Sequence, residues 1–203
     1  MRTLEMAQDL FRNKSAAVGL LIVAVIGITA VVGPSLAPYD PLIPAPLDRL
    51  QGMSSEHVLG TDSLGRDIFS RIIYGSRISL MIGAISVAIS LLPGTLLGLL
   101  AGYFGGWLDS LIMRIMDILL AFPAILLAIF ITAILGPNLT NTMIAVGIVY
   151  IPHYARIVRS SVLSLKQQLF VQAINHLGGS SFRILGKHIL PISLPPFIVY
   201  ATL

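Results

Sequence analysis

Residues 78–102 read ISLMIGAISVAISLLPGTLLGLLAG, and no charged side chain interrupts them. An α-helix rises about 1.5 Å per residue, so a helix over this stretch is long enough to cross the roughly 30 Å hydrocarbon core of a bilayer. The nearest charged residues are Arg77 on one side and Asp109 on the other. This pattern predicts a transmembrane helix.

The composition of the whole chain points the same way. Of 203 residues, 56% are hydrophobic and 11% are charged, whereas a soluble domain carries roughly 25% charged residues to face water. An ordinary cytosolic domain and a disordered chain are both excluded. Because the chain has no cysteine, a disulfide scaffold, a thiolate metal site and a cysteine nucleophile are excluded as well. The expected fold is all-α, a polytopic integral membrane protein.

Further apolar stretches predict additional transmembrane helices at 16–32, 118–135, 139–154 and 189–203. Gly136-Pro137-Asn138 predicts a tight hairpin between the third and the fourth of the five helices. The last stretch contains three prolines and is shorter than the ~20 residues that a crossing needs, so the sequence is expected to end inside its fifth helix. The first stretch also has features of a cleaved signal peptide, although its apolar run exceeds the usual ~7–15 residues.

Lys and Arg are unevenly distributed among the connecting segments. With the N-terminus in the cytoplasm, nine of the 13 lie on the inner side, and the positive-inside rule favours that orientation. The chain then consists of a cytoplasmic N-terminus with the first helix (1–33), an extracytoplasmic loop (34–77) and a core (78–203) that contains a cytoplasmic loop (156–188).

The outer loop begins with prolines that favour extended and turn conformations, and it continues with LGTDSLGRD at 59–67. Gly60 and Gly65 suit turns, and Asp62 is placed to cap a helix that contains Arg66 and Asp67. A solvated loop and a contact surface for an extracytoplasmic partner both fit this segment. The candidate residues are Gly60, Thr61, Asp62, Gly65, Arg66 and Asp67.

Glycine recurs every fourth residue from the second half of the 78–102 stretch onward. Such a ridge without side chains lets another helix approach closely in lipid, where packing drives helix association. We therefore expect helix packing along this ridge, which consists of Gly94, Gly98, Gly102 and Gly106.

Three charged residues lie between the second and third predicted helices. Arg114 precedes Asp117 by three positions, a spacing that suits an ion pair on one helix face, and Asp109 lies five positions before Arg114. We interpret the three as anchors at the membrane interface rather than as a proton relay, because a relay needs ionisable groups at depth.

The cytoplasmic loop carries an amphipathic helix over 166–177. Gly178-Gly179 ends it, and a second helix begins at Ser180 or Ser181 and ends by Lys187. A helix resting on anionic lipid and a helix docking in a partner's groove both fit this pattern. The apolar face consists of Leu169, Phe170, Ala173, Ile174 and Leu177.

No catalytic signature occurs in the sequence: it has no G-x-x-x-x-G-K-[ST] phosphate loop, no H-E-x-x-H and no G-x-S-x-G. The chain is therefore expected not to be an enzyme, and it shows no ligand spacing for a metal. An ion-gradient-driven secondary transporter remains an alternative class. Such a transporter requires ionisable residues or broken helices at mid-membrane, and the charge-free predicted helices argue against it.

The cytoplasmic loop resembles the E-A-A-x-x-x-G…H-x-L-P loop of binding-protein-dependent ABC transporter permeases. Gln172, Ala173 and Gly178 fall on its first part, and His188 and Pro191 fall on its second. The outer motif at 59–67 resembles the C-type permease of dipeptide, oligopeptide and nickel transporters. Segments 113–123 and 154–159 are similar to that branch too, so the resemblance covers essentially the whole chain.

This resemblance implies a bacterial cytoplasmic-membrane protein. It implies partners: a second permease in a heterodimer, one or two cytoplasmic P-loop ATPases that bind ATP and magnesium, and an extracytoplasmic binding protein. Besides these, the chain contacts membrane lipid, with no cofactor of its own and no nucleic acid. Gln172 stands where the family has Glu, which removes a charged contact, and family members continue through a fifth and a sixth helix.

Overall fold

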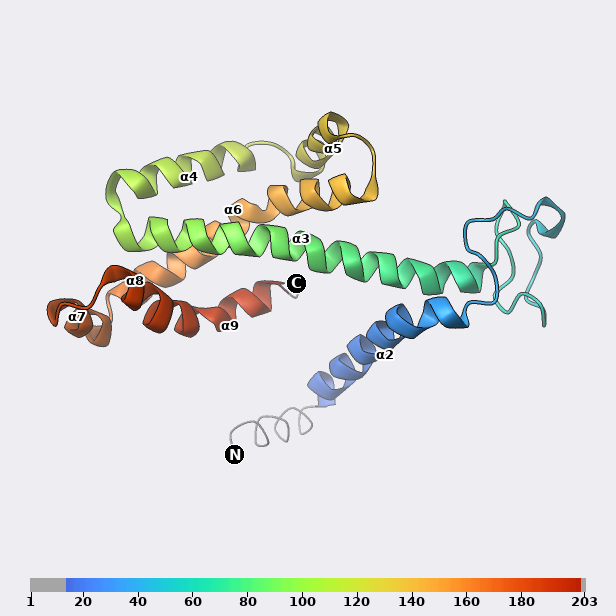
Figure 1. Ribbon diagram of the computed structural model, residues 1–203, viewed down its shortest axis with the longest axis horizontal. Coiled ribbons are helices and arrows are strands. Elements are labelled where there is room, and N and C mark those ends of the chain that lie inside the picture. Colours follow the sequence, from blue (N-terminus) through green and yellow to red (C-terminus); the bar gives the residue numbers. More distant parts are fainter. Residues whose placement is uncertain (1–13, 202–203) are drawn as a thin grey trace. The chain divides into compact units, whose positions relative to one another are not determined.

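The computed structural model describes residues 14–201, and they are helical apart from loops and a single isolated bridge between Thr61 and Asp67. The chain forms two compact units, one up to Ile82 and the other from Gly83 onward. Between residues 14 and 201 no strand forms, which confirms the all-α expectation. Figure 1 shows the helices in chain order.

The first unit contains α2 (Lys14–Leu36), a loop with the 3₁₀ turn η1 (Pro46–Asp48), and the beginning of α3 (Ile68–Phe104). Most aliphatic side chains of α2 are exposed, as expected for a helix that faces lipid. The exception is the contact of Gly33 with Ile73. A Cβ on Gly33 would lie 2.3 Å from the Cγ2 of Ile73, so the two helices touch through this glycine.

α3 is a continuous helix of 37 residues and begins ten positions before the predicted start at 78. Its earlier start comes from Asp67, whose Oδ2 accepts a hydrogen bond of 2.7 Å from the backbone N–H of Ser70. Asp67 therefore caps α3, and the expectation that Asp62 caps a helix containing Arg66 and Asp67 is wrong.

The second unit contains the rest of α3, α4 (Gly106–Leu120), α5 (Ala124–Leu135) and α6 (Leu139–Lys166). The chain then continues through α7 (Leu169–His176), α8 (Ser181–Arg183), the π-helix η2 (Ile184–Ile189) and α9 (Leu190–Ala201). Figure 1 shows α4 beside the end of α3 and beside α6, with α7 following the end of α6.

The helix expected over 118–135 is two helices instead. α4 ends at Leu120, α5 begins at Ala124, and the two are bent by 91°. Pro123 precedes α5 with an extended ψ of 127°. Proline has no N–H and disfavours a helical conformation in the residue before it, so it ends α4. α4 thus places Asp109, Arg114 and Asp117 on a helix. If α4 and α5 together form one membrane span, that span is not charge-free, and the argument from charge-free helices does not apply to it.

The predicted hairpin at 136–138 is present, and its residues join α5 to α6. Gly136 has φ 97°. The Oδ1 of Asn138 accepts a hydrogen bond from the N–H of Asn141, and the Asn141 side chain donates to the carbonyl oxygens of Leu135 and Gly136. These bonds satisfy both helix ends at the turn.

The second helix of the cytoplasmic loop does not end by Lys187 as expected. Its path continues through η2 and α9 past Pro191. A proline ring crowds the carbonyl four residues earlier, and the wider π-turn just before Pro191 accommodates that crowding.

By length and apolar composition, α2 and α3 can each cross a membrane among residues 14–201, and α4 with α5 is a third candidate if the bent pair is one span. The crossings expected at 139–154 and 189–203 remain predictions.

Candidate functional site

α7 carries the apolar face predicted for the cytoplasmic loop, on a shorter helix that begins at Leu169 rather than 166. Leu169 is 83% exposed, Leu177 is 88% exposed and Phe170 is 38% exposed. Ala173 is exposed beside them. We call these four residues, Leu169, Phe170, Ala173 and Leu177, the α7 apolar surface. Exposed apolar side chains so close together are typical of an interaction site.

The opposite side of α7 faces a hydrophobic core. Val171 is 3% exposed, and Ile174 packs against the same core. Ile174 therefore does not belong to the outward face, where the sequence placed it. The core fixes α7 onto the end of α6 and the return helices, and it contains Tyr103, Val158, Val162, Leu165, Val171, Ile184, Leu185, Ile189 and Phe197.

Gly178 ends α7 as predicted, in the left-handed conformation with φ 82°. Its N–H donates to the carbonyl of Asn175, and the N–H of Gly179 donates to the carbonyl of Ile174 at 3.0 Å. These two bonds form a Schellman motif. A Cβ on Gly179 would lie 2.7 Å from the Ile174 side chain, so both glycines are needed at this turn.

The remaining residues of the predicted loop motif lie outside the α7 apolar surface. Gln172 is exposed, and its Nε2 donates a hydrogen bond of 3.0 Å to the carbonyl of Gln167, in the connection that joins α6 to α7. His188 is half-buried in η2, and Pro191 is exposed in the first turn of α9. The structure therefore places His188 and Pro191 on the return path, not on α7.

The predicted glycine ridge packs against α6 at three of its four positions. A Cβ added to Gly94 would lie 2.6 Å from the Cβ of Tyr154. One added to Gly98 would lie 2.5 Å from the carbonyl oxygen of Ala155, and one added to Gly102 would lie 2.8 Å from the Cβ of Val162. These contacts let α3 and α6 lie in direct contact along this face.

Gly106 is not part of this ridge. It has φ 59°, and a Cβ there would meet nothing within 4 Å. Together with Gly105 it forms the turn from α3 into α4. A further close contact, not predicted from the sequence, lies at Gly147, where a Cβ would lie 2.5 Å from the Cγ2 of Ile89. The small residues of α6 could have indicated this contact.

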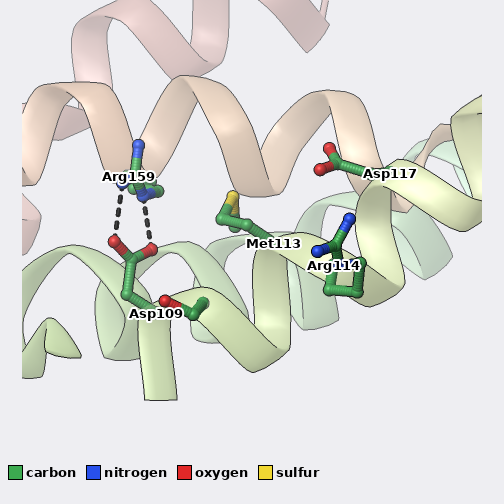
Figure 2. A pocket seen from close by; sticks show the side chains of 6 residues that line it. Asp109, Met113, Arg114, Asp117 and Arg159 are labelled. Carbon is green, nitrogen blue, oxygen red and sulfur yellow. Dashed lines mark hydrogen bonds and ion pairs between the residues drawn. The ribbon is translucent and has the colours of Figure 1, made fainter. Parts of the chain in front are cut away.

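An open cavity of about 350 Å³ with a charged lining lies between α4 and α6 (Figure 2). Arg159 donates from Nε to Oδ1 of Asp109 at 2.5 Å and from Nη2 to Oδ2 at 2.6 Å. Arg156 donates from Nη2 to Oδ1 of Asp117 at 2.5 Å. The predicted pair between Arg114 and Asp117 is therefore replaced by a pair between helices.

The outer motif of the first unit forms a network of hydrogen bonds around Asp67. Oδ1 of Asp67 lies 3.0 Å from Nδ1 of His57, and both side chains are buried. Tyr39 stacks on the His57 ring at 4.7 Å, and its N–H donates to the Oγ of Ser70. Burial raises the pKa of Asp67, but hydrogen bonds from the Ser70 N–H and from His57 outweigh it, so the pKa lies below its ordinary value.

Asp62 accepts hydrogen bonds from the N–H groups of Leu64 and Arg66 and from the side chains of Arg66 and Arg71. Burial raises the pKa of Asp62, but the hydrogen bonds from Arg66 and the two backbone groups outweigh it, and its pKa lies well below the ordinary value. Thr61 bridges loop segments: its Oγ1 donates to the carbonyl of Asp48 and accepts from the N–H of Gln51.

Gly60 and Gly65 form the turns predicted for this loop, with φ 75° and 78°. A Cβ on Gly65 would lie 1.7 Å from the carbonyl oxygen of Ala45, and one on Gly60 would lie 2.5 Å from that of Gln51. All six predicted motif residues thus hold the loop together from within. Sequence analysis did not place the buried partners His57 and Ser70 in this network.

Two family descriptions match the chain. Residues 94–203 match the binding-protein-dependent transport system inner membrane component, and residues 3–52 match the N-terminal transmembrane domain of oligopeptide transport permease C. The first covers α7, the glycine contacts and both ion pairs between α4 and α6.

Curated relatives are similar in sequence to this chain over nearly its whole length. The dipeptide transport system permease protein of Alkalihalophilus pseudofirmus is 51% identical over 98% of this chain and 66% of its own length. The glutathione transport system permease protein of Pectobacterium atrosepticum is 47% identical over 93% of this chain and 63% of its own length. The di/tripeptide transport system permease protein of Pseudomonas aeruginosa is 45% identical over 98% of this chain.

The chain spans 63 to 68% of the length of these relatives. Its helices, its apolar spans and its match to the family over more than half of the sequence agree with one another. The chain belongs to the family of binding-protein-dependent transport system inner membrane components, the permeases of bacterial inner membranes.

Proposed function

We propose that this chain is the C-type permease subunit of an ATP-driven importer for peptides or a related small solute, such as glutathione, a nickel chelate or an opine. The names of the relatives support peptides and glutathione. The observation that carries the proposal is the α7 apolar surface, which is exposed on one side of a helix whose other side is anchored in a core.

In this proposal a second, different permease pairs with this chain to enclose the pathway. One or two kinds of cytoplasmic P-loop ATPase bind ATP and magnesium, and a binding protein delivers the solute from outside. Closure of the ATPase pair on ATP displaces α7, and the pathway alternates between inward-facing and outward-facing states. The chain itself performs no chemical step.

The role of α7 follows from the physical chemistry of its surface. Leu169 and Leu177 lose contact with water when they enter a groove, and removing apolar area from water contributes about 25 cal/mol per Å², which the entropy lost on association partly offsets. A short helix with apolar side chains on one face fits the helix-in-groove mode of recognition. Its fixed attachment to α6 lets a displacement of α7 reach the membrane helices.

Ala173→Trp tests this role, because a large side chain on the α7 apolar surface clashes in a packed groove. The matched control is Asn175→Trp, exposed on the same helix but about 200° around it. We expect Ala173→Trp to reduce both the ATPase that copurifies with the permease pair and ATP-dependent dipeptide uptake, and Asn175→Trp to reduce them much less. If both variants assemble and transport normally, α7 rests on lipid and the proposed coupling role is wrong.

Gln172→Glu restores the acid that the resembled family carries at this position. If the ATPase presents a basic group there, the variant holds or strengthens assembly and makes it more sensitive to salt, because salt screens exposed charges. A loss of assembly would show that the ATPase surface is adapted to glutamine.

A further inference from the structure

Two ion pairs join α4 to the second half of α6. The Asp109–Arg159 pair has two parallel hydrogen bonds, of 2.5 and 2.6 Å, and the Asp117–Arg156 pair has one of 2.5 Å. The first is the more shielded: the side chain of Asp109 is 18% exposed and that of Asp117 is 53% exposed. Figure 2 shows the first pair across the cavity.

An apolar contact accompanies the two pairs. Ile112 and Met116 of α4 pack with Ala155 of α6 and Ala101 of α3. About two turns beyond Arg159, Nζ of Lys166 donates a hydrogen bond of 2.6 Å to the carbonyl of Tyr103, at the end of α3. The last part of α6 is thus attached to α3 and α4, and α7 follows it directly.

Adhesion alone does not explain the two ion pairs. Well-packed apolar residues would hold the helices at least as firmly, because desolvating a pair of charges offsets much of their attraction. What a bidentate arginine–carboxylate pair adds is geometry, since its two parallel bonds form in one orientation only. The Asp109–Arg159 pair therefore specifies which turns of α4 and α6 face each other, and the more exposed Asp117–Arg156 pair adds a second contact between the same helices.

We propose that Asp109, Asp117, Arg156 and Arg159 are positioning residues that hold α4 and α6 in a single register throughout the transport cycle, so that a displacement of α7 moves both helices as one body. This inference rests on the proposed function, because it gives these residues a part in coupling. It assigns them no contact with solute or nucleotide.

The first test compares neutral variants with an exchange of charges. Asp109→Asn and Arg159→Gln each remove one partner, and the double variant Asp109→Arg with Arg159→Asp restores a pair of opposite sign. Arg114→Gln is the matched control, since Arg114 lies on α4 and lines the same cavity but its side chain has no hydrogen bond or ion pair with residues 14–201. The readouts are the yield of assembled complex, ATP hydrolysis and dipeptide uptake.

We expect the neutral variants to assemble and hydrolyse ATP while uptake per hydrolysed ATP falls about tenfold, the scale of a disrupted interaction between neighbouring charges. The exchange should recover most of the loss, and Arg114→Gln should match the unmodified chain. Unchanged coupling in the neutral variants would overturn the inference. So would equal losses in the neutral variants and in the exchange with normal assembly, because then the individual side chains matter rather than the pair.

The second test uses the absence of cysteine from the sequence. In a chain with Asp109→Cys and Arg159→Cys the ion pair is absent, so uptake should be low before cross-linking. A short bifunctional thiol reagent that links α4 to α6 should restore uptake, because the link holds the two helices in their register in place of the pair. This arm stays informative if the neutral variants fail to fold, since removing both partners leaves no unpaired charge. Cross-linked chains whose uptake stays low or falls further would contradict the inference.

The unmodified complex separates this inference from the proposed function. If it couples ATP hydrolysis to uptake, only the variants and the cross-link decide the inference. If it hydrolyses ATP with its partners but imports no dipeptide, glutathione or nickel chelate, the proposed function fails, and the inference fails with it.

Discussion

The carbonyl oxygen of Ala155 lies 2.5 Å from the point where a Cβ on Gly98 would begin. The Cβ of Val158 lies 2.6 Å from the same point. Neither of these atoms is the end of a flexible side chain, so neither can move aside without a shift of α6. The absence of a side chain at Gly98 is therefore a condition for the contact between α3 and α6.

Gly98→Ala is expected to lower the stability of the second unit by about 1–3 kcal/mol, the range for overpacking a close contact. The control is Gly83→Ala on the same helix, where a Cβ meets nothing within 4 Å. Thermal unfolding of the purified chain in detergent should give a lower midpoint for Gly98→Ala only. Equal midpoints would mean that α3 and α6 are not in close contact at this glycine.

Asp67→Ala is expected to loosen the outer loop, because it removes the cap of α3 and the partner of the buried His57. Loss of an N-cap costs about 0.5–2 kcal/mol, and an unsatisfied buried group adds about 1–3 kcal/mol. Glu56→Ala, at an exposed acid of the same loop, is the control. Hydrogen exchange of residues 57–70 should accelerate for Asp67→Ala and stay unchanged for Glu56→Ala.

Acid should weaken the same loop. The pKa values of Asp62 and Asp67 are lowered in the folded state, so their stabilisation is complete above the unfolded value near 3.9 and is lost as pH falls through the folded values. Protection against hydrogen exchange should therefore decline below about pH 4. In the double variant Asp62→Asn with Asp67→Asn, this acid-dependent decline should be much smaller. An identical decline in both chains would assign it to other groups.

The orientation is tested by single cysteines, since the natural sequence has none. Ser55 lies in the outer loop and Ser164 near the end of α6, and both are exposed. An impermeant thiol reagent added to intact cells should label Ser55→Cys and leave Ser164→Cys unlabelled until the membrane is opened. The reverse pattern would invert the predicted topology.

The spacing of residues along the sequence was sufficient to predict features that depend only on nearby residues of one helix. The four-residue spacing of Gly94, Gly98 and Gly102 identified a packing face, and Gly178 identified the end of α7. The same spacing extended the face to Gly106 because periodicity does not register the end of a helix. A positive φ at Gly106 ends the pattern there.

Spacing within one helix could not predict hydrogen-bond and ion-pair partners that lie far apart in the sequence. Asp117 has a suitable arginine three positions before it, yet it pairs with Arg156, 39 positions away, because α4 turns back beside α6. Asp62 was expected to cap a helix that contains Arg66 and Asp67, whereas α3 begins after Asp67, and only the loop's hydrogen bonds decide where the helix begins. Tertiary contacts select between alternatives that are locally equivalent.

The length of α3 determines where its capped end lies relative to the hydrocarbon of the bilayer. Its 37 residues span about 55 Å, which exceeds the roughly 30 Å of hydrocarbon in a bilayer. The surplus lies at the beginning of the helix, where Arg71 and Arg77 precede the charge-free stretch. The Asp67 cap therefore lies beyond the stretch that the hydrocarbon covers, and because Asp67 and His57 are buried, it is the folded loop and not lipid that shields these hydrogen bonds from water.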